Sequence, residues 1–301
     1  MFRSLLALFL ISSLLSFSVA ARAAEEVGGP SAHTVGQWRV YRLTDGAATG
    51  KAALFVDTDP NLVQTYLPDG TYPTAIQYFL LRGHGKTILI DTGLGKNLAR
   101  QLAEAGIKPE AIDAILLTHM HGDHIGGLLT ADQAVFPDAT IYLSEKEKAY
   151  WIDPKMMAKA GPAKKDNFLL AQRALAVYGD RVKTFFPSSF AAGGATLLPT
   201  IKAIAAYGHT PGHSMFLLED GSDKLLFWGD LTHAMAMQMP APQVAMVYDI
   251  NPKEAVATRL AVLRHVAAQK LAVAGMHIPD PAIGHLRAAG AGYVFMPEGE
   301  K

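Results

Sequence analysis

The run Thr-His-Met-His-Gly-Asp-His at residues 118–124 constrains this chain more than any other part of it. It follows the short apolar run 114–117. Two imidazoles spaced two residues apart on extended backbone, followed by an Asp-His pair, can direct several nitrogen and oxygen donors into one small volume. Borderline divalent metals such as zinc prefer these ligands. The motif therefore predicts a metal site, and a surface cluster of histidines is the alternative.

The N-terminus has the pattern of a signal peptide, predicted at residues 1–23. Arg3 supplies a positive charge, residues 4–19 are uncharged and largely apolar, and residues 21–23 fit the small-x-small cleavage pattern. The apolar run is short for a membrane span, and no stop-transfer pattern follows it. We expect a periplasmic or secreted protein with no stable membrane association after cleavage. An uncleaved anchor is the alternative.

Composition narrows the classes of function. The chain has no cysteine, so an exported form has no disulfides, no cysteine-ligated metal and no cysteine nucleophile. Lys+Arg and Asp+Glu number 27 each, which gives no global field for nucleic acid or an anionic membrane. Half of the residues are apolar and can support a sizeable core. We expect a flexible arm at residues 24–35 and one domain at residues 36–301.

Strands and helices alternate along the chain, which predicts the α/β class. Two strand–turn–strand units have the same design, one at residues 79–91 and one at residues 216–230, and each ends in an aspartate. They suggest a fold of two similar halves, each with a sheet. Further strands are predicted at 38–43, 52–56 and 271–274, helices at 97–105, 166–178 and from 252 onward, and a loop at 58–73.

Three later apolar runs also end in a histidine or an aspartate, and ligands collect at such positions in α/β sheets. Residues 201–206 lead to His209, residues 225–228 to Asp230, and residues 271–275 to His277. With the first motif they make seven candidate ligands: His119, His121, Asp123, His124, His209, Asp230 and His277.

These motifs, in this order and together with Asp91-Thr92-Gly93, resemble the metallo-β-lactamase superfamily of hydrolases. The segments 228–233, 275–277 and 284–288 are similar to its methyl parathion hydrolase and lactonase branch. The resemblance covers most of the chain after residue 38. It implies an αββα sandwich, with two mixed sheets inside and helices on both outer faces.

The resemblance also implies a division of the ligands. His119, His121 and His209 would bind one metal, Asp123, His124 and His277 the second, and Asp230 would bridge them. Two cations this close need a shared anion, and a water between them would be deprotonated near neutral pH and act as the nucleophile. Asp123 and Asp230 are the candidate catalytic residues, and Asp123 could also carry a proton to the leaving group. We expect two divalent ions, zinc first, with iron, manganese or cobalt as alternatives.

Other positions leave two roles open. Asp91 could hold a ligand histidine or cap a turn. His213 and His233 are expected to support the fold or the ligands rather than bind metal, whereas His285 could face the pocket or not. The methionine-rich stretch 234–248 could line an apolar pocket or pack in the core. Trp151 and the two methionines after it could form a lid or a packed helix end.

The expected substrate is a small neutral molecule: a lactone, an aryl ester or a phosphotriester. The shared aspartate argues against β-lactamases, and the charge balance argues against nucleases. The alternatives are a β-lactamase, a thioester hydrolase of the glyoxalase II type, an iron-dependent redox member, or a non-catalytic metal-stabilised binding protein. A homodimer is left open.

Overall fold

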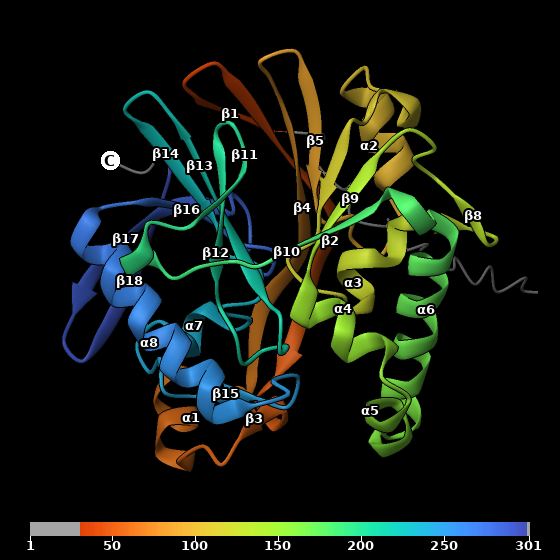
Figure 1. The fold of residues 1–301 in the computed structure, drawn as a ribbon. Coiled ribbons are helices and arrows are strands. Elements are labelled where there is room, and N and C mark those ends of the chain that lie inside the picture. Colours follow the sequence, from red (N-terminus) through yellow and green to blue (C-terminus); the bar gives the residue numbers. More distant parts are fainter. Residues whose placement is uncertain (1–30, 300–301) are drawn as a thin grey trace, which may run out of the picture.

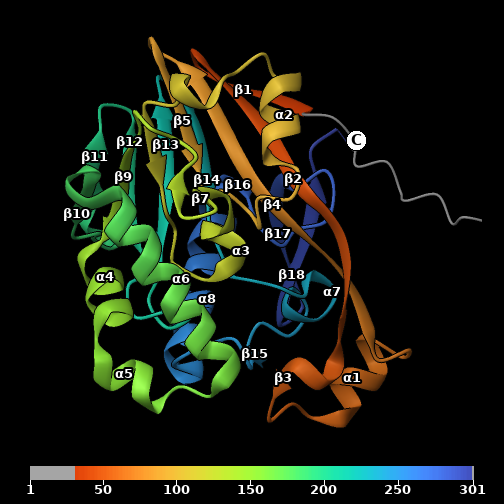
Figure 2. The same ribbon diagram turned by 90° about the vertical axis from the view of Figure 1, so that its right-hand side faces the viewer.

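Two mixed β-sheets pack face to face, with helices on their outer sides (Figures 1 and 2). The computed structural model describes residues 31–299. The arrangement is the αββα sandwich that the sequence predicted. The predicted signal peptide and the first part of the arm lie outside the described residues. No helix between residues 31 and 299 has both the length and the apolar character that crossing a bilayer requires.

The first sheet has the order β1-β2-β4-β5-β6-β9-β10. Its strands are β1 (Ser31–Val35), β2 (Trp38–Lys51), β4 (Thr71–Gly83), β5 (Lys86–Ile90), β6 (Ala114–Leu116), β9 (Thr140–Ser144) and β10 (Val182–Phe185). Neighbouring strands in the series β1, β2, β4 and β5 are antiparallel, whereas β5, β6, β9 and β10 run parallel to one another. The carboxyl ends of β5 and β6 therefore meet at one edge of the sheet.

The second sheet has the order β11-β12-β13-β14-β16-β17-β18. Its strands are β11 (Ala195–Leu198), β12 (Ile201–Ala205), β13 (Ser214–Asp220), β14 (Asp223–Phe227), β16 (Ala272–Ala274), β17 (Ile283–Ala289) and β18 (Gly292–Pro297). β13 is antiparallel to both β12 and β14, and β14 is parallel to β16. The strands β12, β14 and β16 therefore run in the same direction and end at the same edge.

Helices cover the outer faces and one end of the sandwich. Figure 1 places α2 (Leu98–Glu104), α3 (Gly122–Ile125), α4 (Glu145–Ile152), α5 (Pro154–Lys159) and α6 (Pro162–Tyr178) beside the first sheet. It places α7 (Met235–Gln238) and α8 (Pro252–Gln269) beside the second, and α1 (Pro60–Tyr66) below the long β2–β4 hairpin.

Two short pairs complete the fold: β3 (Phe55–Val56) with β15 (Ala245–Met246), and β7 (Leu129–Thr130) with β8 (Gln133–Ala134). The 3-10 turns are η1 (Ala52–Leu54), η2 (Pro109–Ala111), η3 (Gly126–Leu128), η4 (Gly179–Arg181) and η5 (Phe190–Ala192).

The side chains of β4 show how the sheet divides the core. Phe79 and Leu81 join the core that both sheets and α8 share, whereas Tyr78 and Leu80 join the core beneath α2 and α6. Successive side chains of a strand point to opposite faces, and here both faces are covered. This is why the strands of the central hairpins appear in the sequence as continuous apolar runs.

The structure confirms both predicted hairpins, as β4–β5 and β13–β14, and the start of the last long helix. The side chain of Asn251 caps α8 by accepting a hydrogen bond from the backbone N–H of Glu254 at 3.3 Å. The prediction of a loop at residues 58–73 is wrong. The middle of this segment is α1, because Asp59 caps a helix whose first residue is Pro60, a favourable position for proline.

Three boundaries also differ from the sequence prediction. Residues 31–35 of the expected flexible arm form β1, since they pair with β2 and bury Val35 in the shared core. The strand expected at 52–56 is a 3-10 turn followed by only two strand residues. The helix expected from 166 begins at Pro162, which occupies its first turn.

Candidate metal centre

Loops from both sheets meet at one edge of the sandwich and carry the predicted ligands. β6 leads into the histidine motif, and the last two ligands of that motif lie in the first turn of α3. The strands β12, β14 and β16 of the second sheet lead into the other three, which are His209, Asp230 and His277. The structure brings all seven side chains together in two groups that could each hold a metal ion.

The first triad is His119, His121 and His209. Nε2 of His119 lies 3.0 Å from Nδ1 of His121, which in turn lies 2.9 Å from Nε2 of His209. Each pair of rings meets edge to face, with centroids 4.7 Å apart. Three ring nitrogens this close point toward one common position, as three ligands of a single ion do.

The second triad is Asp123, His124 and His277. Oδ2 of Asp123 lies 3.8 Å from Nε2 of His124 and 3.5 Å from Nε2 of His277. His124 is buried, whereas the side chain of Asp123 is 29% exposed. The second triad therefore has a side that opens to solvent.

Asp230 contacts both triads. Its Oδ2 lies 3.2 Å from Nε2 of His209 and 3.2 Å from Nε2 of His277, and its Oδ1 lies 3.1 Å from Nε2 of His124. The residue before it must be glycine, because Gly229 has φ +58° and a Cβ there would fall 2.3 Å from the His213 ring. The position of Asp230 is the one that a carboxylate shared by two ions requires.

The hydrogen bonds around the rings fit a pair of divalent cations. Nε2 of His124 and Oδ1 of Asp230 are buried and lie 3.1 Å apart, but neither makes a hydrogen bond of normal geometry within the described chain. Four rings place their other nitrogen within hydrogen-bond distance of an outward acceptor, which leaves a lone pair for the centre. The acceptors for His119, His124, His209 and His277 are Thr118 Oγ1, Asp91 Oδ2, Asp249 Oδ1 and the Ala75 carbonyl.

Electrostatics favour the ligand forms of both carboxylates and of His119 and His121. Burial opposes the charge of Asp230, but the surrounding imidazoles, His124 above all, outweigh it and hold the pKa of Asp230 well below its usual range. The pKa of Asp123 is lowered by the same balance. Burial, with neighbouring imidazoles, holds the pKa values of His119 and His121 well below the histidine range. Ionised carboxylates and neutral imidazoles are the forms that bind metal. At His124, His209 and His277 burial lowers the pKa, but the neighbouring carboxylates outweigh it and raise the pKa, so metal binding must displace a proton from these rings.

Two buried aspartates outside the ligand set orient the rings. Asp91 lies 2.7 Å from Nδ1 of His124 and accepts hydrogen bonds from the backbone and the hydroxyl of Thr118. Of the two roles left open for Asp91, the geometry supports the one that holds a ligand. Sequence reasoning missed Asp249, which lies 2.9 Å from Nδ1 of His209. No motif marks Asp249, since it follows an irregular segment far from His209 in the chain.

The remaining histidines take different places. Burial lowers the pKa of His213 to about 3, and its neutral ring accepts a hydrogen bond from the backbone N–H of Asp230 at 3.0 Å. His233 lies nearer the centre than the sequence suggested: its Nε2 is 3.0 Å from Oδ2 of Asp230, and its ring stacks on that of His277. Asp230, His233 and His277 form a third group that could hold a metal. His285 lines a cavity that contains none of the seven predicted ligands.

The methionine-rich stretch 234–248 is mainly core. Met237, Met239 and Met246 are at most 3% exposed, whereas Tyr248 at its end is 40% exposed and lies 5.5 Å from the His233 ring. Trp151 is a packed helix end rather than a lid: it is 2% exposed, and its ring edge meets His121 at 5.7 Å. The stretch therefore contributes only its last residues to the surface near the metal centre.

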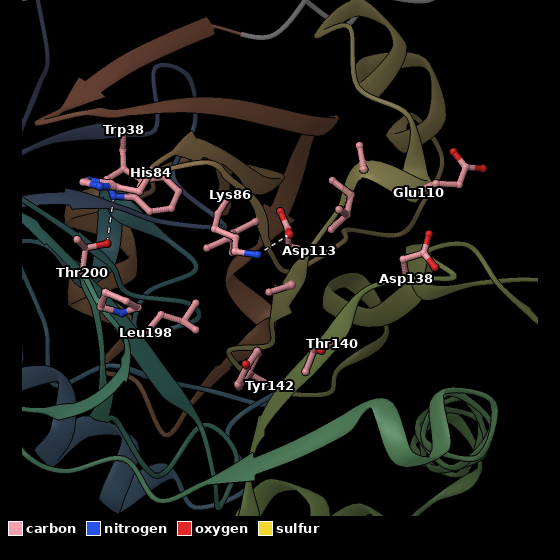
Figure 3. A pocket seen from close by; sticks show the side chains of 15 residues that line it. Trp38, His84, Lys86, Glu110, Asp113, Asp138, Thr140, Tyr142, Leu198 and Thr200 are labelled. Carbon is pink, nitrogen blue, oxygen red and sulfur yellow. Dashed lines mark hydrogen bonds and ion pairs between the residues drawn. The ribbon is translucent and has the colours of Figure 1, made fainter.

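A separate cavity of about 690 Å³ lies between the sheets, away from the metal centre (Figure 3). Its lining includes Lys86 and Ala114, the first residues of β5 and β6, whereas the centre is built beyond the last residues of these strands. In Figure 3 the Lys86 ammonium points to the Asp113 carboxylate, 2.8 Å away. No predicted ligand lines this cavity, so its size does not make it the reaction site.

With this fold and these ligand groups, the chain belongs to the metallo-β-lactamase superfamily. The model of that family matches residues 71–272, a range that contains every predicted ligand except His277. The membership confirms the resemblance that the histidine motif suggested.

Two solved structures are similar over nearly the whole chain. The hydrolase AbOPH, a protein of the beta-lactamase superfamily, is 32% identical, with 92% of this chain and 100% of AbOPH covered and a TM-score of 0.82. AidC, a dizinc quorum-quenching lactonase solved with the product N-hexanoyl-L-homoserine, is 27% identical, with coverages of 91% and 98% and a TM-score of 0.80.

The curated relatives match over shorter stretches. Exodeoxyribonuclease WalJ of Streptococcus pneumoniae is 37% identical over 91 residues, which cover 30% of this chain and 33% of WalJ. Ribonuclease TTHA0252 of Thermus thermophilus is 28% identical over 190 residues, which cover 59% of this chain and 39% of the ribonuclease. This chain thus spans well under half of each, and these matches support the family without naming a substrate.

His277→Ala is expected to lower occupancy of the second triad more than that of the first. His277 supplies one of the three side chains of the second triad, whereas the first triad keeps all of its imidazoles. Metal analysis of the variant after dialysis should give close to one ion per chain where the wild type gives two. Retention of two ions with unchanged affinities would contradict the division of ligands.

Proposed function

We propose that the protein is an exported binuclear metal-dependent hydrolase of neutral, apolar ester-type substrates, with lactones and aryl esters preferred over phosphotriesters. The observation that carries the proposal is the contact of Asp230 with histidines of both triads. Structural metal sites usually have four ligands and are closed. Seven ligands that share one carboxylate favour a catalytic pair of ions over a site that only stabilises the fold.

The residues take separate roles in the proposed reaction. Two bound ions would supply a water deprotonated near neutral pH and would polarise the C=O or P=O group of the substrate. The side chain of Asp230 is 2% exposed, so it holds the centre and does not reach the substrate. We assign the proton transfer to Asp123: its side chain is 29% exposed, and its lowered pKa keeps it ionised, so it could accept a proton and pass it to the leaving oxygen.

Apolar side chains beside the centre support an apolar substrate. Trp151 packs against His121, and the next residue, Ile152, is 48% exposed. Tyr248 packs against His233, and Val247 beside it is 41% exposed. An exposed aromatic side chain such as Tyr248 beside a polar centre suits a ligand with a neutral reactive group and an apolar substituent. The similarity to the lactonase AidC supports the same substrate class.

A substrate panel tests this proposal. The zinc-loaded protein would be assayed on an acylated lactone, p-nitrophenyl acetate, an aryl phosphotriester, a phosphodiester, a thioester and a β-lactam. We expect the highest kcat/KM on the lactone or the aryl ester, a lower value on the phosphotriester, and loss of all hydrolysis in EDTA. No EDTA-sensitive turnover on any compound would sink the hydrolase assignment.

The same panel separates the alternatives. A phosphodiester as best substrate would favour a nuclease-like activity, as in the curated relatives, and the β-lactam or the thioester would favour those two classes. Iron in protein purified from its native host, with oxygen-dependent turnover, would favour a redox member. Export rests on the N-terminal sequence alone, and the mass of the mature protein tests it, because cleavage should remove about 23 residues.

A further inference from the structure

Glu147 in α4 is a buried carboxylate outside the ligand set, and it makes four hydrogen bonds. Its Oε1 accepts from the backbone N–H of Met120 at 3.0 Å and from Nε1 of Trp151 at 2.6 Å. Its Oε2 accepts from the hydroxyl of Thr210 at 2.6 Å and from the backbone N–H of Gly212 at 2.9 Å. Every lone pair that a carboxylate ordinarily uses therefore meets a donor.

Three of the four donors belong to the loops that carry the first triad, and the fourth, Trp151, lies in α4 itself. Met120 lies between His119 and His121, and Thr210 directly follows His209. The loops after β6 and β12 come from different sheets and are separated by almost ninety residues. One carboxylate thus joins the two loops that supply the three histidines of this triad. Its bond to Trp151 also holds the ring that packs against His121.

The loop after β12 packs closely against the start of α4. A Cβ at Gly212 would fall 2.2 Å from the backbone nitrogen of Glu147, so only glycine allows this approach. The distance from the helix to the loop is therefore set by backbone contact as well as by the carboxylate. A shorter or differently shaped side chain at position 147 could not keep all four hydrogen bonds.

The charge of Glu147 has no direct counter-ion. Within residues 31–299 no lysine, arginine or histidine forms an ion pair with it, and the side chain is fully buried. Burial raises the pKa of Glu147, while its four hydrogen bonds oppose that rise. Because all four contacts are donors, the geometry suits the ionised carboxylate, and a proton on either oxygen would displace one of them.

We propose that Glu147 is a positioning residue for the first metal site, which locks the loops of His119, His121 and His209 at the spacing that an ion needs. The inference rests on the proposed binuclear function. Asp91 orients a ligand of the second triad, because its carboxylate lies against Nδ1 of His124. Among the ligand loops, Glu147 contacts only those of the first triad, whereas Asp91 contacts His124 directly and reaches His119 only through Thr118, and this difference makes the proposal testable.

Metal titration of Glu147→Gln and Asp91→Asn tests the division. The amide that Glu147→Gln introduces would turn its N–H groups toward two of the four donors, so two of the four hydrogen bonds are lost. Metal-free protein would be titrated with Co²⁺ and with Zn²⁺ against a chromophoric chelator. The Co²⁺ absorption bands of the two sites would be assigned from His121→Ala and His277→Ala.

We expect Glu147→Gln to weaken binding at the first triad roughly 10- to 100-fold, the usual effect of losing a residue that orients metal ligands, and to leave the second within about threefold. Asp91→Asn should weaken the second site most, with a smaller loss at the first site, because Asp91 also holds the Thr118 hydroxyl that contacts His119. Thr210→Val removes one hydrogen bond and should give a smaller loss, at the first site only. Wild-type affinity at both sites in Glu147→Gln and Thr210→Val would overturn the proposal.

Tyr178→Phe is the matched control for a general loss of stability. The Tyr178 hydroxyl also makes two buried hydrogen bonds, to the Leu128 carbonyl and from the Phe136 N–H, and neither partner is a predicted ligand or a sequence neighbour of one. If Tyr178→Phe loses metal in proportion to its fall in Tm, as Glu147→Gln does, the effect is structural and the proposal fails. Titration needs no substrate, so a wild type that binds two ions but hydrolyses nothing contradicts only the proposed function.

Discussion

Asp230→Asn should lower kcat/KM on the best lactone or aryl ester by at least about 10³-fold and leave fewer than two ions per chain. Asp230 contacts histidines of both triads through both carboxylate oxygens. An amide keeps the size of the side chain, but it brings no charge and turns N–H groups toward positions that need an acceptor. The two cations would then repel each other without a shared anion between them.

Kinetics and metal content of the same preparation check this expectation. Asp223→Asn is a suitable control, because this exposed carboxylate lies in the same sheet and, within the described chain, hydrogen-bonds to Ser222 and to the backbone of Gly36, far from the ligands. The control should keep both ions and full activity. An Asp230→Asn variant with two ions and a rate within about tenfold of the wild type would show that Asp230 is not the bridging ligand.

Removal of metal should abolish hydrolysis and lower Tm by roughly 10–20 °C. A ligand present at a hundred times its Kd stabilises the folded state by about 2.7 kcal/mol, and two ions would double this. In a domain of this size each kcal/mol corresponds to about 2–4 °C. The physical source is the centre itself, where buried ring nitrogens and carboxylate oxygens crowd together without enough protons to pair them.

Thermal unfolding with excess Zn²⁺ and with EDTA measures this shift. EDTA already saturated with Zn²⁺ controls for effects of the chelator itself, and added Zn²⁺ should restore both Tm and activity to the stripped protein. A Tm that is the same with and without metal would mean that the buried centre does not depend on ions for its stability, contrary to the fit of its donor atoms.

The central hairpins were predictable because their strands are covered on both faces, and such strands consist of consecutive apolar residues. Helix α8 was predictable because Asn251, Pro252 and Glu254 form a local capping signal. Helix α1 was not, since the three prolines and the glycine of segment 58–73 pointed to a loop and the packing of the helix against the β3–β15 pair is set by distant residues. Local patterns identify elements whose stabilising contacts are local or periodic.

At the metal centre, the order of amino acids was enough to name the candidate ligands, because His and Asp carry the nitrogen and oxygen atoms that metals prefer wherever the fold places them. It also determined the superfamily, since that depends on the order of motifs. The three-dimensional packing was needed to show which atoms meet: that Asp230 stands between the triads, that Asp249 and Glu147 support the first triad, and that His233 lies against the centre. Most of these contacts join residues far apart in the chain, and only the packing of one sheet on the other sets their distances.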